Sequence, residues 1–267
     1  MTAIVLIPAR YDSTRFPGKP LAPLLGKPLI QHVYENSKKS RLAKDVIVAT
    51  DSKPILDAVA AFGGKAVMTS SSHASGTDRI AEAAASMDYD IIVNVQGDEP
   101  LIKPEMIDDV IGLLDDRTAS MGTLIKRIES PEDIFDPNVV KVVFNKDGFA
   151  MYFSRAPIPF NRDAWSVQRS AFSIQLETRN LPTGQAGSKL ETRNWYKHIG
   201  IYSYRKDVLL SLARMNPVQL EQIEKLEQLR ALFNGLKIKV KETSFETIGV
   251  DTPHDLERVK QWLSLYS

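Results

Sequence analysis

A basic loop follows the first apolar run of the chain, and its residue types suit the binding of phosphates. The apolar run covers positions 3–7, and positions 10–19 read RYDSTRFPGK. Arg10, Arg15 and Lys19 offer the positive charge that a polyphosphate needs when it leaves water. Ligands of open α/β sheets bind at the carboxyl ends of the strands, so we predict a phosphate site in this loop. A solvated surface loop is the alternative that these residues leave open.

Two aspartates follow strand-like segments and could hold a divalent cation. Asp98 comes directly after the largely apolar run at 91–97, and Asp251 comes after the run at 247–250. A bound polyphosphate needs a divalent metal to neutralise its charge, and such cations often take only one or two carboxylates from the protein. We therefore predict a metal at Asp98 and Asp251. The alternatives are a turn residue at Asp98 and a helix cap at Asp251, since Pro253 suits the first helical position.

The segment at 73–79, HASGTDR, combines hydroxyl groups with an arginine at the expected start of a helix. Ser75 or Thr77 could cap that helix. A cap does not require Arg79, and an arginine and a hydroxyl near a helix start suit nucleotide recognition. This segment is therefore a second candidate for nucleotide binding.

Three segments of the second half carry polar side chains that could bind a small ligand. Arg155 could hold a carboxylate through two hydrogen bonds, or could lie on the surface beside a proline-rich turn. His198 and Tyr202 alternate along one expected strand and so share a face, where they could hydrogen-bond a polyol or simply fill the core. The segment at 220–230 has the pattern of an amphipathic helix, whose charged face is solvated by default.

Alternating strand and helix patterns must position these residues. Expected strands cover 4–8, 46–50, 65–68, 91–96, 120–125, 140–144, 198–203, 238–241 and 248–250, and expected helices cover 29–38, 54–62, 77–86, 104–115, 221–233 and 255–265. Strands separated by helices of this length favour βαβ units. We therefore predict an α/β fold, with a mainly parallel twisted sheet flanked by helices.

A smaller α+β insertion, at about 129–194, breaks this rhythm within a single domain that spans 1–267. Inside it the sequence LETRN occurs twice, at 176–180 and at 190–194. The residues between the copies are typical of a flexible surface loop. It could act as a lid or bind a partner, or it could be a duplication that is tolerated in solvent.

Composition limits the classes of function. With 34 basic and 33 acidic residues in 267, nothing points to nucleic acid or an anionic membrane as a partner. The absence of cysteine excludes disulfides and thiolate metal sites. The opening apolar run is too short for a membrane span and lacks the pattern of a signal peptide, so we expect a soluble cytoplasmic protein.

The pattern R-x-x-S-x-R-x-P-G-K at 10–19 resembles the signature of the sugar-activating cytidylyltransferases, which transfer CMP from CTP to an acidic sugar. The segments QGDEP at 96–100 and VDTPHDL at 250–256 look like those that bring Mg²⁺ to CTP in that family. The segment at 73–79 is similar to the one that contacts cytosine. The resemblance implies a fold of the nucleotide-diphospho-sugar transferase type, with Mg²⁺ on Asp98 and Asp251.

The segments SRAPIP, HIGIY and LEQLR, which begin at 154, 198 and 226, resemble one subgroup, the 3-deoxy-manno-octulosonate (KDO) cytidylyltransferases. The resemblance implies a homodimer that serves lipopolysaccharide assembly. It implies CTP contacts at Arg10, Ser13, Lys19, Ser75 and Arg79, catalytic roles for Lys19, Arg15, Asp98 and Asp251, and a sugar site at Gln96, Arg155, His198, Tyr202, Glu227 and Gln228.

The expected reaction is in-line attack of the anomeric hydroxyl of KDO on the α-phosphate of CTP, with loss of pyrophosphate. Lys19, Arg15 and the metal would offset charge in the transition state, and no histidine or glutamate stands out as a general base. Three alternatives stay open. They are a cytidylyltransferase for sialic acid or an amino-KDO, a uridylyl- or guanylyltransferase of similar fold, and a CTP-binding regulator without turnover.

Overall fold

The computed structural model describes residues 1–12, 15–162 and 195–266. The expected CTP contact Ser13 and the repeat loop at 176–194 lie outside the described residues. Within the described part of the chain, no helix is both long enough and apolar enough to span a membrane.

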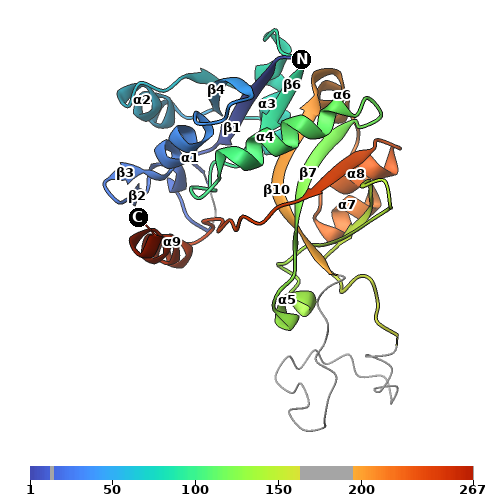
Figure 1. The fold of residues 1–267 in the computed structure, drawn as a ribbon. Helices are drawn as coiled ribbons and strands as arrows, with labels where there is room; N and C mark the ends of the chain where they lie inside the picture. Colours follow the sequence, from blue (N-terminus) through green and yellow to red (C-terminus); the bar gives the residue numbers. More distant parts are fainter. Residues whose placement is uncertain (13–14, 163–194, 267) are drawn as a thin grey trace.

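A sheet of nine described strands forms the centre of the molecule, in the order β11-β7-β10-β6-β1-β4-β5, with β8 beside β10 and β9 beside β8 (Figure 1). The strands are β1 (Ala3–Ala9), β4 (Ala43–Thr50), β5 (Ala66–Met68), β6 (Ile91–Asn94), β7 (Met121–Arg127), β8 (Lys141–Phe144), β9 (Ala150–Ser154), β10 (Tyr196–Arg205) and β11 (Ile238–Glu242). Strands β2 (Pro23–Leu24) and β3 (Lys27–Pro28) form a separate small sheet.

The helices are α1 (Leu29–Ser37), α2 (Lys53–Ala61), α3 (Gly76–Ala85), α4 (Pro104–Gly112), α5 (Pro131–Phe135), α6 (Lys206–Leu212), α7 (Gln219–Glu224), α8 (Gln228–Phe233) and α9 (Pro253–Tyr266). Two short 3₁₀ turns cover Lys19–Leu21 and Leu113–Asp115.

The mainly parallel sheet that the sequence predicts is confirmed. Strand β1 pairs in parallel with both β4 and β6, β4 pairs in parallel with β5, and β7 does so with β11. Along the path from β11 to β5, β10 alone of the described strands runs against the rest. The carboxyl ends of β1, β4, β5 and β6 therefore meet at one edge, where binding residues of α/β sheets gather.

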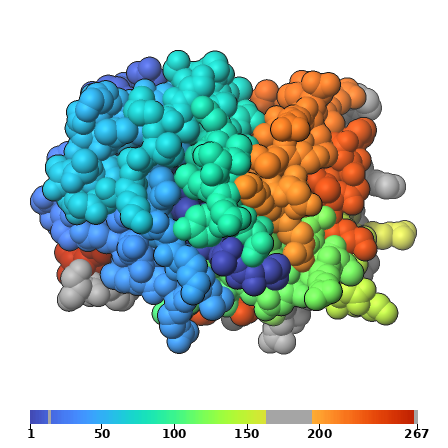
Figure 2. All heavy atoms as spheres, turned by 90° about the horizontal axis from the view of Figure 1, so that it is seen from above, coloured from blue at the N-terminus to red at the C-terminus, as the bar shows by residue number. Residues whose placement is uncertain are grey.

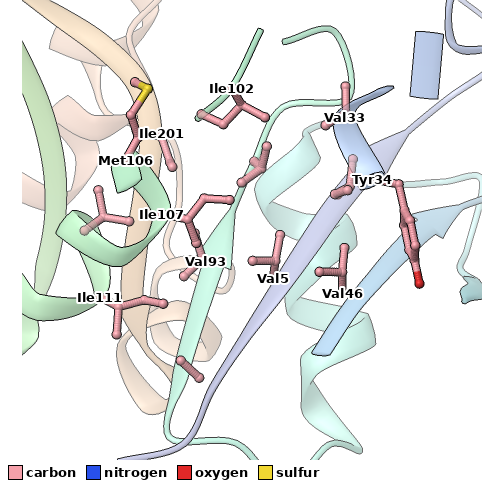
Figure 3. Packing of buried hydrophobic residues seen from close by; sticks show 14 of the residues in the cluster. Val5, Val33, Tyr34, Val46, Val93, Ile102, Met106, Ile107, Ile111 and Ile201 are labelled. Atoms are coloured by element: carbon pink, nitrogen blue, oxygen red, sulfur yellow. The ribbon is translucent and has the colours of Figure 1, made fainter. Parts of the chain in front are cut away.

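Helices cover both faces of the sheet because its central strands are apolar on both sides. In β1, Val5 faces a cluster that includes Val33 of α1 and Ile107 of α4, while Leu6 faces a cluster that includes Ile80 of α3. Figure 3 shows Val5 beside Val46 and Val93 of the neighbouring strands. Side chains that alternate along a strand point to opposite faces, so a strand this apolar must be buried between two helical layers.

Residues after 195 complete the same sheet. In the space-filling view their orange atoms lie side by side with the teal atoms of the first half of the chain (Figure 2). Strand β10 pairs with β6 on one side and with β7 on the other. The described part of the expected insertion continues this sheet, because β8 pairs with β10 and β9 with β8.

Two local predictions were wrong. The strand expected at 248–250 is irregular chain, although the Val250 nitrogen donates to the Asp98 carbonyl oxygen at 2.9 Å. The helix expected at 221–233 is divided into α7 and α8, because Lys225 adopts a left-handed conformation with φ of 54°. Left-handed residues occur singly and end helices, and apolar periodicity alone does not reveal one.

Helix α9 packs against the loop that follows β1. Its Leu256 and Val259 join Leu24, Leu29 and Val250 in a small apolar cluster, and Figure 1 shows α9 beside β2 and β3. This packing brings residues near 250 to the loop at 10–19, about 240 positions earlier in the sequence.

Candidate active site

A cavity of about 270 Å³ opens at the carboxyl edge of the parallel strands. Segments from four places meet there: the loop after β1, the start of α3, the turn after β6 and the start of α9. The lining residues include the predicted Arg10, Arg15, Lys19, Ser75, Arg79, Gln96, Asp98 and Asp251. The structure therefore brings together all the described residues that we expected to bind the nucleotide or a metal.

Lys19 lies at the centre of the charged groups in this cavity. Its Nζ is 2.6 Å from Asp98 Oδ2 and 3.3 Å from Asp251 Oδ1, and its side chain is 14% exposed. Arg15 is 66% exposed and reaches Asp251 Oδ2 with Nη2 at 3.2 Å. Lys19 is thus held in place by two carboxylates, whereas Arg15 lies at the mouth of the cavity.

Glycines shape both loops that carry these charges. Gly18 has φ of 69°, a left-handed conformation that glycine adopts without strain, and its nitrogen donates to the Tyr11 carbonyl oxygen at 2.9 Å. A Cβ on Gly97 would lie 2.8 Å from the carbonyl oxygen of Pro8. Gly97 therefore allows the ends of β1 and β6 to pass close together, which places Lys19 and Asp98 in one site.

The cap of α9 leaves the Asp251 carboxylate free to face Lys19. Thr252 Oγ1 accepts a hydrogen bond from the Asp255 nitrogen at 3.3 Å, and Asp255 Oδ2 accepts one from the Thr252 nitrogen at 2.9 Å. This reciprocal pair satisfies the exposed donors at the helix start. The carboxyl group of Asp251 is therefore not the helix cap.

Glu99 lies next to the carboxylate pair of Asp98 and Asp251. The sequence analysis did not predict it as a residue of the site. Its Oε2 is buried and has no hydrogen-bond partner among the described residues. Burial, together with the nearby charges of Asp98 and Asp251, raises the pKa of Glu99 to about 8. Its place within the segment QGDEP was the only signal in the sequence.

A second cavity of about 110 Å³ adjoins the first, and Gln96 lines both. Its other lining residues are Thr77, Asn94, Met121, Tyr202, Tyr204, Leu212, Glu227 and Gln228. Four of the six expected sugar-site residues line it, namely Gln96, Tyr202, Glu227 and Gln228. Amide, hydroxyl and carboxyl groups around a small space suit a polyhydroxylated ligand.

Glu227 is the acidic group of this second cavity. Its Oε2 accepts a hydrogen bond from Thr77 Oγ1 at 2.5 Å, while its Oε1 is buried and makes no hydrogen bond among the described residues. Arg230 Nη2 is 3.7 Å from Oε1. Burial raises the pKa of Glu227 above its usual value.

The other two expected sugar-site residues line neither cavity. His198 Nε2 is 3.0 Å from Thr123 Oγ1, and its ring packs against Tyr202 with the centroids 5.2 Å apart. Burial lowers the pKa of His198 to about 3, so its ring is neutral at neutral pH. Arg155 donates from Nε to the carbonyl oxygen of Glu224 and from Nη1 to that of Pro137, each at 2.7 Å.

Comparison with known proteins identifies the family. A family model described as Cytidylyltransferase matches residues 4–238. A 3-deoxy-manno-octulosonate cytidylyltransferase from Geobacter metallireducens is 54% identical over 267 residues, which cover 100% of this chain and 99% of the relative. Another from Thermodesulfovibrio yellowstonii is 50% identical and covers 100% of both chains. The chain belongs to the 3-deoxy-manno-octulosonate cytidylyltransferases.

One solved structure supports the assignment to this family, and a second supports the fold. One, a CMP:2-keto-3-deoxy-manno-octonic acid synthetase complexed with CTP, has a TM-score of 0.86 and 40% identity, with 100% of both chains covered. A cytidylyltransferase from Leptospira borgpetersenii has a TM-score of 0.61 at 18% identity, covering 99% of this chain and 87% of that one. The second comparison supports the fold alone.

The carboxylate pair of this KDO cytidylyltransferase family member offers a suitable donor set for a divalent cation. Oxygens of Asp98 and Asp251 both approach the single Lys19 nitrogen, and carboxylate oxygen is what Mg²⁺ prefers. The described residues hold no group of three or more histidine, cysteine or acidic side chains arranged for a metal. Two protein carboxylates leave positions for phosphate oxygens and water, as Mg²⁺ usually requires.

Several residues of the site escaped the sequence analysis although a signal was present. Asp51 directly follows β4, as Asp98 follows the strand-like run at 91–97, and it pairs with the cavity residue Arg79 at 2.8 Å. Tyr204 shares a strand face with Tyr202 and lines the same cavity. The rule that placed Asp98 at a strand end would also have found Asp51.

Proposed function

We propose that this protein transfers CMP from CTP to KDO, releasing CMP-KDO and pyrophosphate. The observation that carries this proposal is the pair of adjoining cavities joined by Gln96. One cavity presents arginines, a lysine and a carboxylate pair, which suit a triphosphate. The other presents uncharged polar groups and one half-buried carboxyl, which suit a polyhydroxylated sugar. Relatives named for this enzyme match along the whole chain.

The basic loop stabilises the charge that develops as the reaction proceeds. The anomeric oxygen of the sugar forms a bond to the α-phosphorus while the bond from that phosphorus to pyrophosphate breaks. Lys19 is held within the cavity by its two carboxylates, so it presents a fixed positive charge to the phosphates. Arg15 is exposed at the mouth and adds a second charge where pyrophosphate leaves.

We propose that Asp98 and Asp251 hold Mg²⁺ during turnover. When bound, the cation would neutralise the triphosphate and orient it for attack. The support is the chemistry of the two carboxylates and their shared position beside Lys19.

The second cavity positions the acceptor sugar. Gln96 lies at the boundary between the two cavities, where its amide can contact both substrates. Glu227 lines this cavity, where its carboxyl group can accept a hydrogen bond from a sugar hydroxyl. Arg155 makes its hydrogen bonds to backbone carbonyls of the protein, and a part in holding the sugar carboxylate stays a prediction for it.

The experiment that tests this function is pyrophosphate release from CTP and Mg²⁺ with KDO, with sialic acid, and with no sugar. Release with KDO alone is the expected result. Release only with sialic acid would retain the nucleotide site and overturn the sugar assignment. Bound CTP without release in any reaction would instead favour a nucleotide-binding regulator.

From the family resemblance we also propose that the protein is a homodimer, that it lies in the cytoplasm and that it serves lipopolysaccharide assembly. Light scattering during size-exclusion chromatography tests the dimer, for which a mass of twice 29.8 kDa is expected. A single species of 29.8 kDa would contradict it.

A further inference from the structure

Arg79 enters the nucleotide cavity from the first turn of α3 and is almost completely buried, with 4% of the residue exposed. Its Nη1 donates to Thr69 Oγ1 at 2.7 Å and lies 3.5 Å from the Ser70 carbonyl oxygen. Its Nη2 donates to Asp51 Oδ2 at 2.8 Å. The guanidinium is therefore held from two sides, by a carboxylate and by a hydroxyl.

The two groups that hold Arg79 are set opposite each other by the sheet. Thr50 and Met68 are paired in the parallel ladder of β4 and β5, and Asp51 and Thr69 each follow one of them. The Thr69 nitrogen also donates to the Thr50 carbonyl oxygen at 2.9 Å. The hydrogen-bonded ladder therefore fixes the distance between Asp51 and Thr69. We call these two residues the clamp.

The clamp leaves part of the guanidinium for a ligand. Arginine has five N–H donors in a planar fork, and the bonds to Asp51, Thr69 and Ser70 use Nη1 and one side of Nη2. Arg79 Nε has no hydrogen-bond partner among the described residues, and this nitrogen is not completely buried. The edge formed by Nε and Nη2 can donate two parallel hydrogen bonds to a planar ligand with two adjacent acceptors.

The base of a cytidine nucleotide carries such a pair of acceptors. Cytosine presents the acceptors O2 and N3 side by side. Uracil carries a hydrogen on N3, so its N3 cannot accept a hydrogen bond from the second N–H of the arginine. A site built to form a hydrogen bond strongly rejects an analogue that cannot accept it. An arginine fixed before the nucleotide arrives also loses less conformational freedom on binding.

We propose that Asp51 is a positioning residue for the choice of base: with Thr69, it orients Arg79 so that the remaining edge of the guanidinium selects cytosine over uracil. The inference rests on the proposed function only in that a nucleotide occupies this cavity. Asp51 acts through Arg79, and its own carboxylate is engaged with the guanidinium.

The test is calorimetric binding of CTP and of UTP to the full chain and to Asp51→Asn. The variant keeps an oxygen acceptor but loses the charge that orients Arg79, and hydrogen bonds to charged groups are among the stronger ones. We expect the Kd for CTP to rise about 10-fold and the Kd for UTP to change less than about 2-fold. The preference for CTP over UTP would then fall about 10-fold.

Asp45→Asn is the matched control. Asp45 lies on the same strand near its other end, is mostly buried, and forms ion pairs with Lys65 and Lys38. This variant also loses a paired carboxylate, but it should keep the wild-type base preference. Equal losses of preference in both variants, or a preference within about 2-fold of wild type in Asp51→Asn, would overturn the inference.

Thr69→Val and Thr69→Ser provide a second test if Asp51→Asn does not fold. Valine removes the acceptor for Arg79 Nη1 and serine retains it, so the base preference should fall in the first variant and return in the second. Equal preferences in the two variants would count against the clamp.

Binding does not depend on turnover, so the two proposals can fail separately. A wild-type protein that releases no pyrophosphate but loses its CTP preference in Asp51→Asn would refute only the proposed function. A wild-type protein that binds CTP and UTP equally would refute the inference alone, provided that it still transfers CMP to KDO.

Discussion

Replacing Gly97 by alanine should disturb both the stability and the active site of this protein. A Cβ at position 97 would lie 2.8 Å from the Pro8 carbonyl oxygen, whereas ordinary contacts begin at 3.4 Å. The Pro8 oxygen is a backbone atom and the position of a Cβ is fixed by its own backbone, so no side-chain rotation can relieve the clash. The ends of β1 and β6 would have to separate by about 0.6 Å.

The loss of folding stability caused by that separation can be estimated from the contacts between β1 and β6. The last bond between the two strands, from the Val95 nitrogen to the Leu6 carbonyl oxygen, is 3.2 Å long and lies close to the clash. Overpacking of this kind typically costs about 1–3 kcal/mol. A loss of about 2 kcal/mol in a chain of this size corresponds to a fall of roughly 4–8 °C in the unfolding temperature.

Gly112→Ala is the matched control for this measurement. A Cβ at position 112 meets no heavy atom within 4 Å, and Gly112 is the last residue of α4. Alanine is favoured over glycine in helices by about 0.5–1 kcal/mol, so this variant should be neutral or slightly more stable. The same chemical change is therefore expected to have opposite signs at the two positions.

Thermal unfolding of both variants, followed by circular dichroism, measures the difference, and pyrophosphate release measures its effect on the site. Because Gln96 and Asp98 flank position 97 and line the cavity, we expect Gly97→Ala to lose kcat as well as stability. An unfolding temperature of Gly97→Ala equal to that of Gly112→Ala would refute the steric argument.

Three further predictions concern charged and titrating groups. Asp98→Asn should lower kcat at least 100-fold with little change in the Kd for CTP, and its turnover should no longer respond to added Mg²⁺; normal turnover would refute the metal assignment. His198 stays neutral when folded, with a pKa of about 3 against 6.5 in the unfolded chain. Since only the unfolded chain takes up this proton between those values, wild-type stability should fall from about pH 6.5 towards pH 3, and less so in His198→Gln by urea unfolding at several pH values. Arg155→Ala should lower the urea midpoint because its hydrogen bonds join separate segments; a raised KM for KDO at unchanged stability would instead place Arg155 at the sugar.

Much of the first cavity was predictable because its charged residues follow local rules. A basic loop after an apolar run, and an aspartate where a run ends, are visible over ten positions or fewer. Lys19 and Asp98 were found in this way, and the structure brings them to 2.6 Å from each other. The strands at the centre of the sheet were found for the same reason, since residues buried on both faces are almost all apolar.

The second cavity was less predictable because its shape depends on contacts between distant segments. Thr77 and Glu227 are 150 positions apart and joined by a hydrogen bond, and no local pattern marks such a pair. His198 and Arg155 have residue types that suit a sugar, yet neither lines either of the two cavities described above. The type of a side chain limits what it could bind. Only the packing of the folded chain decides which neighbour that side chain contacts.

The amino-acid sequence by itself determined the α/β class, the sheet's core strands, the family and the charged residues that line the first cavity. These depend on periodicity and on short motifs, which are properties of neighbouring positions. Only the tertiary structure decided that Asp251 faces Lys19 rather than capping α9, that Gln96 joins two cavities, and that Asp51 and Thr69 clamp Arg79. The physical reason is that each of these contacts joins segments far apart in the chain, and their distances are set by the packing of the whole sheet.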